Sequence, residues 1–413
     1  MSKFKIAGGV YREICLFPER REILGSGGRA AAALCRVAQN IELNAFIHED
    51  HLKEVRTSLL APYDFDLEPH PIPTPLSQGN QSNLISFRWI HGLASPQQEP
   101  LIDRDVEPFV MNVDGEIVLR YGMVEGSAVV DAEWAVYDPQ APLHARHFSH
   151  NGSKATNLAY VVNSSEARLL TGSDDPSRQL LELHKHEGAS VVVLKQGPHG
   201  AIVSDGQRTS RVPCFKTERV WPIGSGDVFS AVFCHEWAVL RKPAADAAYL
   251  ASVATASYCD AGYLPLSQDF ATAAFAPCLP TVKPGERRRV YLAGPFFSVA
   301  QRWLIDTLRD TFTKLGVDVF SPIHDAGEGK DEVVAMEDLA GIDRSDLLFA
   351  VCDGLDAGTL FEVGYAVSRR KPVIAFTITE KDEDLTMLRG TGCDVVRDLD
   401  SAIYRAVWAA LER

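Results

Sequence analysis

Two acidic residues stand six positions apart near residue 360. Asp356 lies in a loop that also contains Gly358, and Glu362 falls in the first turns of a helix expected up to about Ser368. A carboxylate in the loop and a second one at the start of the helix can face one pocket. Such a pair suits cleavage of a glycosidic bond, in which one carboxyl group stabilises or traps the sugar carbon and another acid protonates the leaving group.

Further residues that suit this chemistry lie upstream. Asp338 belongs to an acidic stretch, and the loop from Tyr291 to Phe297 offers aromatic surface on which a nucleobase can stack. Carboxylates beside aromatic side chains that can stack on a base indicate chemistry at the N-glycosidic bond of a nucleoside or nucleotide. The alternative is that these acids cap helices and pair with arginines such as Arg302 and Arg344.

Residues 290 to about 396 resemble the nucleoside 2-deoxyribosyltransferase family. Three stretches occur in the order of that family: the aromatic-Gly-Pro-Phe-Phe loop from Tyr291, the Asp-Leu-x-Gly-Ile stretch from Asp338, and the Asp-x-Gly-x-x-x-Glu-x-Gly-Tyr-Ala stretch from Asp356. The resemblance implies that Glu362 is the nucleophile that forms a covalent glycosyl-enzyme. It also implies that Asp338 handles the proton of the leaving base and that Asp356 orients the sugar or the nucleophile.

The same resemblance assigns the substrate pocket. It places Tyr291 and Phe297 beside the base, in loops that contain Gly294 and Gly358, and it implies a homo-oligomer in which a neighbouring copy completes the site. Ser298 and Arg302, at a helix start, can hold a 5′-phosphate or can simply cap the helix. The motif does not separate transfer to a second base from hydrolysis, and NAD is a further possible substrate.

A second group of residues, nearer the N-terminus, suits phosphate chemistry. Gly224, Ser225 and Gly226 form a tight turn before a helix, whose free N–H groups and dipole attract phosphate, and the next residue, Asp227, can act as a base. A glycine turn of this kind is often only a turn. Upstream, two expected strands are followed by further polar and glycine residues: Asn163, Glu166, Gly197 and Gly200.

In this order the motifs resemble ribokinase-like, PfkB-type sugar and nucleoside kinases over about residues 4 to 276. The resemblance implies ATP and Mg²⁺ as cofactors, with Asp227 as the base and Gly224 to Gly226 as the anion hole. Asn163 and Glu166 would organise magnesium and its waters. Gly197 and Gly200 would border the nucleotide.

The sugar-recognition positions of that family differ here. The regions concerned contain Gly8 to Tyr11, Arg29 to Ala32, and Trp221 to Ile223 in place of the usual acidic residue, asparagine and Asp-Thr pair. Two interpretations stay open: the N-terminal domain is an ATP-dependent kinase with an unusual acceptor, or it is a non-catalytic nucleotide sensor that regulates a glycohydrolase.

Two α/β domains must position these residues. Short apolar strands alternate with helices on both sides of a proline-rich and charged segment, which favours parallel sheets covered by helices, with ligands at the carboxyl ends of the strands. We therefore predict an α/β chain with a ribokinase-like domain at 1–277, a linker at 278–289 and a smaller flavodoxin/Rossmann-like domain at 290–413.

Composition limits the other possibilities. The net charge of −14 over 413 residues disfavours nucleic acid as a partner. The eight cysteines are scattered, no apolar run is long enough for export or a membrane span, and His144, His147 and His150 lack an acidic partner at ligand spacing. We expect a cytoplasmic enzyme of nucleoside metabolism that acts on a small molecule and has no structural metal.

Overall fold

The computed structural model describes residues 3–72, 83–102, 109–141, 144–282, 286–327 and 330–413. Residues 283–285 of the expected linker therefore lie outside the described residues. The chain forms two compact units, one made of Met1–Thr217 with Trp221–Ala276 and the other of Glu218–Val220 with Pro277–Arg413. We describe each unit by itself.

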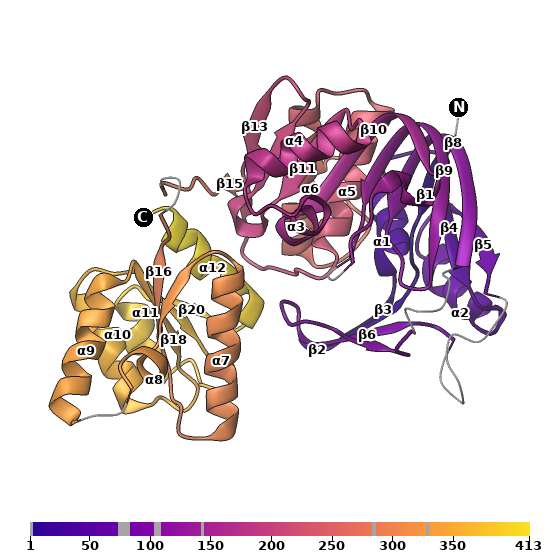
Figure 1. The fold of residues 1–413 in the computed structure, drawn as a ribbon. Coiled ribbons are helices and arrows are strands. Elements are labelled where there is room, and N and C mark those ends of the chain that lie inside the picture. The colour runs from indigo at the N-terminus through magenta and orange to yellow at the C-terminus, as the bar shows by residue number, and fades with distance from the viewer. Residues whose placement is uncertain (1–2, 73–82, 103–108, 142–143, 283–285, 328–329) are drawn as a thin grey trace. The chain divides into compact units, whose positions relative to one another are not determined.

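The first unit is built on a nine-stranded sheet in the order β13-β12-β11-β10-β9-β8-β1-β4-β5 (Figure 1). The run β11-β10-β9-β8-β1-β4-β5 is parallel throughout, and β12 and β13 are antiparallel strands at one edge. The strands are β1 (Phe4–Ala7), β4 (Ile41–Ile47), β5 (Asp66–Pro71), β8 (Phe109–Tyr121), β9 (Gly126–Asp138), β10 (Lys154–Asn163), β11 (Val191–Lys195), β12 (Ala201–Ser204) and β13 (Thr209–Val212).

Helices cover this sheet because its strands are apolar on both faces, as in the wholly apolar start of β11. One face packs against the alanine-rich α1, α5 and the long α6, and part of the other packs against α3 and α4. The helices are α1 (Gly25–Leu34), α2 (Glu49–Leu60), α3 (Ser164–Thr171), α4 (Pro176–Glu187), α5 (Ser225–Cys234) and α6 (Ala244–Ala261), and a π-helical turn (His235–Val239) extends α5.

Strands β8 and β9 have an unusual connection. Each has thirteen residues, they pair in parallel over their whole length, and only Gly122–Glu125 lie between them. A straight strand of that length spans about 43 Å, which a four-residue loop cannot recross. Each strand must therefore bend back on itself. The first halves supply Met111, Val113, Ala128 and Val130 to the core on the face that α3 and α4 share.

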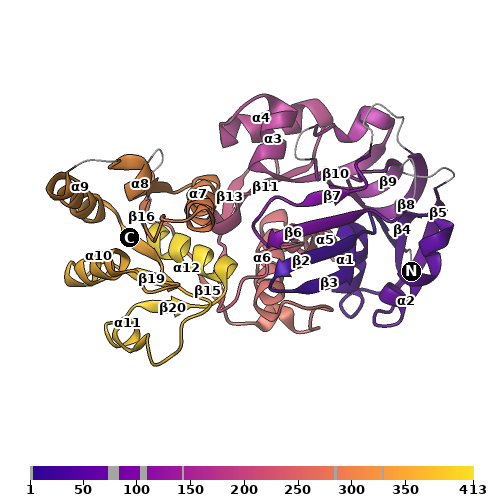
Figure 2. The same cartoon turned by 90° about the horizontal axis from the view of Figure 1, so that it is seen from below.

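Smaller sheets complete the first unit. A four-stranded sheet has the order β3-β2-β6-β7, seen from below in Figure 2, and a two-stranded pair joins β14 to β15. The strands are β2 (Arg12–Phe17), β3 (Arg20–Ile23), β6 (Ser86–His91), β7 (Gln97–Glu99), β14 (Phe215–Lys216) and β15 (Ala276–Pro277). The segment from residue 62 to 98, which shows little periodicity, thus contributes β5, β6 and part of β7, while 73–82 lie outside the described residues.

The second unit has a five-stranded parallel sheet in the order β17-β16-β18-β19-β20. Counted along the chain this order is 2-1-3-4-5, the flavodoxin-like arrangement, which confirms the predicted fold class. The strands are β16 (Arg289–Ala293), β17 (Asp318–Phe320), β18 (Leu347–Val351), β19 (Val373–Phe376) and β20 (Asp394–Val396).

Helices lie on both faces of this smaller sheet. Figure 1 shows α7 and α12 on one face and α9 and α10 on the other. The helices are α7 (Val299–Lys314), α8 (Pro322–Asp325), α9 (Asp331–Arg344), α10 (Ala357–Ser368), α11 (Thr386–Gly390) and α12 (Leu399–Leu411). Across the described residues, no helix is both long enough and apolar enough to span a bilayer.

Candidate active sites

The C-terminal site lies where the strand order of the second unit reverses. The chain leaves β16 on one side of this switch point and β18 on the other, so the loops after these strands meet at their carboxyl ends. The first loop begins at Gly294, where an added Cβ would lie 2.9 Å from Ile305 and 3.0 Å from Val351. A glycine is therefore needed for α7 to pack this close to the sheet.

Glu362 is brought to this point by the second loop. The side chain of Asp356 caps α10 by accepting from the backbone N–H of Thr359 at 2.8 Å, so the helix begins at Ala357, before the predicted start at about Leu360. Glu362 then lies in the second turn. Its Oε1 accepts a hydrogen bond of 2.6 Å from the hydroxyl of Tyr291, which is fully buried on β16.

The environment of Glu362 favours its neutral form. Burial raises its pKa to about 7; the Tyr291 hydrogen bond opposes this shift, and the negative charges of Asp338 and Asp356 add to it. Burial also raises the pKa of Tyr291, so its hydroxyl keeps its proton and acts as a donor. Tyr291 thus reaches the site through its hydroxyl group. Its ring stacks on Phe320, with centroids 5.4 Å apart, inside the core.

Asp338 lies in α9 and faces the same site. Burial raises its pKa to about 6, and the neighbouring Glu337 adds to the shift. Its Oδ1 atom is buried and has no hydrogen-bond partner among the described residues. A buried and unpartnered carboxyl oxygen is suited to carry a proton to or from a ligand. The structure thus brings together Glu362, Asp338, Asp356 and the hydroxyl of Tyr291.

The remaining predicted substrate residues lie near the start of α7. Phe297 is 75% exposed and packs against Phe296. Ser298 and Gln301 form a reciprocal capping box, and Arg302 donates through Nε to the carbonyl of Phe296 at 3.0 Å. These contacts favour helix capping, the alternative that the sequence left open beside phosphate binding. Gly358 lies in the exposed first turn of α10, 3.2 Å from Asp356 when a Cβ is added.

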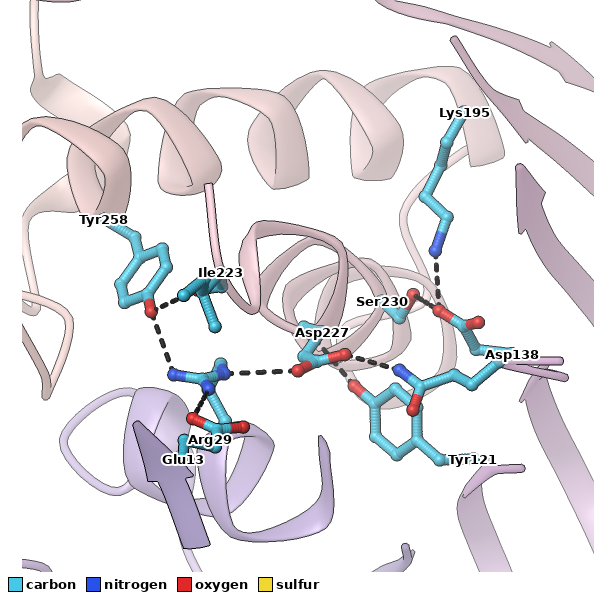
Figure 3. Close-up of polar contacts among 10 residues, drawn as sticks. Glu13, Arg29, Tyr121, Asp138, Lys195, Ile223, Asp227, Ser230 and Tyr258 are labelled. Atoms are coloured by element: carbon cyan, nitrogen blue, oxygen red, sulfur yellow. Dashed lines mark hydrogen bonds and ion pairs between the residues drawn. The ribbon is translucent and has the colours of Figure 1, made fainter. Parts of the chain in front are cut away.

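The N-terminal site is a chain of polar contacts around Asp227 (Figure 3). Asp227 lies in the first turn of α5, and its Oδ2 accepts from Nε of Arg29 at 3.2 Å. Its Oδ1 accepts from Gln140, and its backbone carbonyl accepts from the hydroxyl of Tyr121 at 2.7 Å. Burial raises the pKa of Asp227 to about 6, although the charge of Arg29 opposes the shift.

Arg29 is the centre of this network. It comes from α1, is 1% exposed, pairs with Glu13 of β2, and donates through Nη1 to Tyr258 at 2.9 Å. Gly224, with φ of +76°, comes just before α5, and a Cβ added there would lie 1.7 Å from Nε of Arg29. The guanidinium group therefore lies directly against the glycine turn that the sequence predicts as an anion hole.

A second cation lies beside Gly226. The Lys195 ammonium at the end of β11 lies 3.5 Å from a Cβ added to Gly226 and donates to Asp138 at 2.6 Å. Asp138, at the end of β9, also accepts from Ser230 at 2.6 Å. Burial opposes protonation of Lys195, but the carboxyl groups of Asp138 and Glu166 raise its pKa.

Asn163 and Glu166, predicted to organise magnesium, bond to each other. They form a capping box at the start of α3, in which each side chain accepts from the other residue's backbone N–H at 2.9 Å. Burial and the charge of Asp138 raise the pKa of Glu166 to about 7. Gly197 and Gly200 lie in the turn between β11 and β12, and Ser225 is the first residue of α5.

Sequence reasoning missed several members of the N-terminal site. In the sequence, Arg29 stands out only as a departure from a family pattern, and no motif marks Glu13, Asp138, Gln140 and Lys195. Asp138 and Lys195 end the two parallel strands that flank β10, a position that could have marked both. Nothing in the sequence indicates that Arg29 pairs with Asp227, 198 positions away.

Other polar features lie apart from both sites. Asp346 accepts from the backbone N–H of Arg289 at 2.7 Å, so it joins the amino-terminal ends of β18 and β16. His147 pairs with Glu187, and His150 contacts Arg146. Among the described residues, no cluster of three His, Cys, Asp or Glu side chains is arranged to hold a metal ion.

Two protein families match parts of the chain. Residues 290–394 match the family model described as nucleoside 2-deoxyribosyltransferase, and residues 149–261 match that of the pfkB family carbohydrate kinases. The chain thus contains a PfkB kinase-like domain followed by a nucleoside deoxyribosyltransferase-like domain, which confirms both predicted resemblances. The first match includes every C-terminal candidate residue, and the second includes Asn163 to Asp227.

Individual proteins resemble the chain more distantly. An uncharacterized protein of Ureaplasma parvum serovar 3 is 33% identical over 99 residues, which cover 21% of this chain and 63% of that protein. The structure of phosphofructokinase-2 from Escherichia coli with potassium has 12% identity and a TM-score of 0.45, covering 65% of this chain and 97% of that one. Fructokinase from Vibrio cholerae O395 has 14% identity and a TM-score of 0.43, covering 62% and 92%.

Proposed function

We propose that the C-terminal unit breaks the N-glycosidic bond of a nucleoside or nucleotide, with Glu362 as the nucleophile. The observation that carries this proposal is the hydrogen bond between Glu362 and the buried hydroxyl of Tyr291, beside the second carboxyl group of Asp338. Tyr291 fixes the carboxyl group and favours its ionised form against the effect of burial. A carboxylate held in this way can approach an electron-poor sugar carbon.

The reaction would proceed in two steps. In the first, a carboxylate oxygen of Glu362 bonds to C1′ while the bond from C1′ to the base nitrogen breaks, and Asp338 gives its proton to the departing base. In the second, water or another base attacks C1′, Glu362 leaves as a carboxylate, and Asp338 takes the proton of the attacking group. Asp356, fixed by its bonds to Thr359, would orient the sugar.

The pKa values of the two carboxyl groups set the expected pH range. Glu362 must be ionised, which favours pH above about 7, whereas Asp338 must be protonated, which favours pH below about 6. The groups interact, so the apparent values belong to the pair. We expect kcat/KM to follow a bell-shaped dependence on pH, with its maximum between these values. Steady-state rates of base release from a nucleoside, measured over a range of pH, test this.

The decisive experiment is mass spectrometry of the peptide containing Glu362 after brief exposure to candidate substrates. A sugar adduct on that glutamate would identify the nucleophile and show whether the sugar is ribose or deoxyribose. Base release without a second base indicates hydrolysis, and exchange with an added base indicates transfer. Nicotinamide release from NAD that is lost in Glu362→Ala would identify a dinucleotide glycohydrolase. An adduct on another residue would contradict the assignment.

For the N-terminal unit, the sequence suggests either ATP-dependent phosphorylation of a sugar or nucleoside or regulation of the glycosidase by a bound nucleotide. We propose the second function, because Asp227 is already paired with Arg29, whereas a general base must be free to take a proton. The test compares glycosidase turnover with and without ATP in wild type and Asp227→Asn. Unchanged ATP dependence supports sensing, and loss of the ATP effect in the variant supports a kinase.

A further inference from the structure

The N-terminal unit already contains a cation where a kinase would receive the transferring phosphoryl group. Arg29 is 1% exposed and its guanidinium group is fixed by Glu13, Asp227 and Tyr258. It fills the space in front of Gly224, since an added Cβ there would nearly coincide with Nε. An anion hole must leave this space open for phosphoryl oxygens.

The contact between Lys195 and Asp138 bears on magnesium binding in the same way. A magnesium ion needs oxygen ligands, chiefly carboxylates, and in a kinase it bridges them to the phosphates. Here the Asp138 carboxylate is bonded to the Lys195 ammonium and to Ser230. One oxygen of Glu166 accepts from the backbone N–H of Asn163, and the Oδ1 atom of Asn163 accepts from that of Glu166.

Two cations already lie among the four carboxyl groups of the network. Arg29 lies between Glu13 and Asp227, while Lys195 lies beside Asp138 and close to Glu166. A divalent ion would add positive charge next to Lys195 and compete with it for Asp138. Because Arg29 fills the space at Gly224 and Lys195 already bonds to Asp138, the residues present do not fit a magnesium–nucleotide complex positioned for phosphoryl transfer.

We infer that Arg29 and Lys195 are built-in cations that close the kinase-type site of this chain to magnesium-bound nucleotide. The contacts with Glu13, Asp227 and Asp138 hold these cations in place, so Asp227 serves as a partner for Arg29. This inference goes beyond the proposed sensor function, because it specifies that a nucleotide bound by the unit is bound without a divalent ion at Gly224 to Asp227.

The wild-type chain provides the first test. Isothermal titration with the non-hydrolysable ATP analogue AMP-PNP is carried out in excess magnesium and in excess EDTA, and radiolabelled ATP is incubated with a panel of sugars and nucleosides. We expect dissociation constants that agree within about twofold and no labelled acceptor, whereas no binding in either buffer would refute the proposed nucleotide sensor. Binding that requires magnesium, or labelling that is lost in Asp227→Asn, would overturn the inference.

Substitution of Arg29 provides the second test. The double variant Glu13→Gln with Arg29→Gln removes one charge of each sign, so the net charge of the network stays the same while the space at Gly224 opens. We expect it to bind magnesium and AMP-PNP at least about tenfold more tightly than wild type. The conservative variant Arg29→Lys keeps the positive charge and should remain like wild type.

The folding of each variant is checked by circular dichroism and by base release from the C-terminal unit. A folded double variant that binds AMP-PNP no better than wild type would show that Arg29 does not close the site. If the double variant fails to fold, the titrations of the wild-type chain still test the inference. The glycosidase proposal has its own test: base release that survives Glu362→Ala would refute it and leave the inference about Arg29 untouched.

Discussion

Each unit places a largely buried carboxyl group near the start of a helix, but one carboxyl group has a charged partner and the other a neutral one. Burial raises the pKa of Asp227 to about 6 and that of Glu362 to about 7. Asp227 is paired with the guanidinium group of Arg29, whereas Glu362 accepts from the neutral hydroxyl of Tyr291. A raised pKa is therefore a poor guide to reactivity, because the charge of the partner decides whether the carboxylate is available.

The largest effect is expected at Glu362, whose hydrogen-bond partner carries no charge. Glu362→Gln removes the proposed nucleophile while keeping the size of the side chain, so kcat/KM for base release should fall by at least about a thousandfold. Glu383→Gln makes the same chemical change at an exposed position of the same unit and should have no effect. Residual activity within about tenfold of wild type would refute covalent catalysis by Glu362.

The ion pair between Asp227 and Arg29 is tested by measuring the stability of the fold. Arg29→Ala leaves Glu13 and Asp227 buried without their cation, so the free energy of unfolding should fall by about 3–5 kcal/mol. Denaturant titration followed by fluorescence measures it, and Arg56→Ala, an exposed arginine on α2, should change it by less than about 0.5 kcal/mol. A loss as small as that of the control would mean that the ion pairs contribute little.

A smaller effect is expected at Tyr291, whose hydroxyl lowers the pKa of Glu362. Tyr291→Phe removes this hydrogen bond, so the pKa rises and the limb of the pH profile that requires ionised Glu362 moves to higher pH. The lost bond to a charged group should lower kcat/KM by about ten- to a hundredfold near neutral pH. A uniform loss with an unshifted limb would assign Tyr291 a purely structural role.

The smallest effect concerns the start of α7. If Ser298 only caps the helix, Ser298→Ala should lower the free energy of unfolding by about 1 kcal/mol and change KM equally for a nucleoside and its 5′-phosphate. The substrate comparison in steady-state kinetics is the informative measurement. A KM that rises for the phosphate alone would show that this helix start binds the phosphate group, as the sequence first suggested.

The sequence predicts the second unit better than the first because its determinants are local. Asp356, Gly358 and Glu362 lie within the cap and the first two turns of α10, so their spacing alone places them at one strand end. The network around Asp227 depends on pairs far apart in the sequence, such as Arg29 with Asp227 and Asp138 with Lys195. Such pairs depend on the order of strands and helices in space, which the local pattern does not encode.

The aromatic residues of the second unit show the same limit. The sequence groups Tyr291 and Phe297 as one stacking wall because they are close along the chain. The structure buries Tyr291 completely and leaves Phe297 exposed, since the first is on a central strand and the second is beyond its end. Alternation along a strand decides which face a side chain reaches, and the loop after Ala293 ends that alternation.

The bent strands β8 and β9 have a consequence for how this protein can vary. Parallel neighbours are ordinarily joined by a separate crossover of a dozen or more residues, whereas here the strands make the return themselves. The segment has almost no spare loop, so losing one residue from Gly122–Glu125 would shift the pairing and turn Met111 and Val113 or their partners away from the core. This connection therefore cannot be shortened without disturbing the sheet.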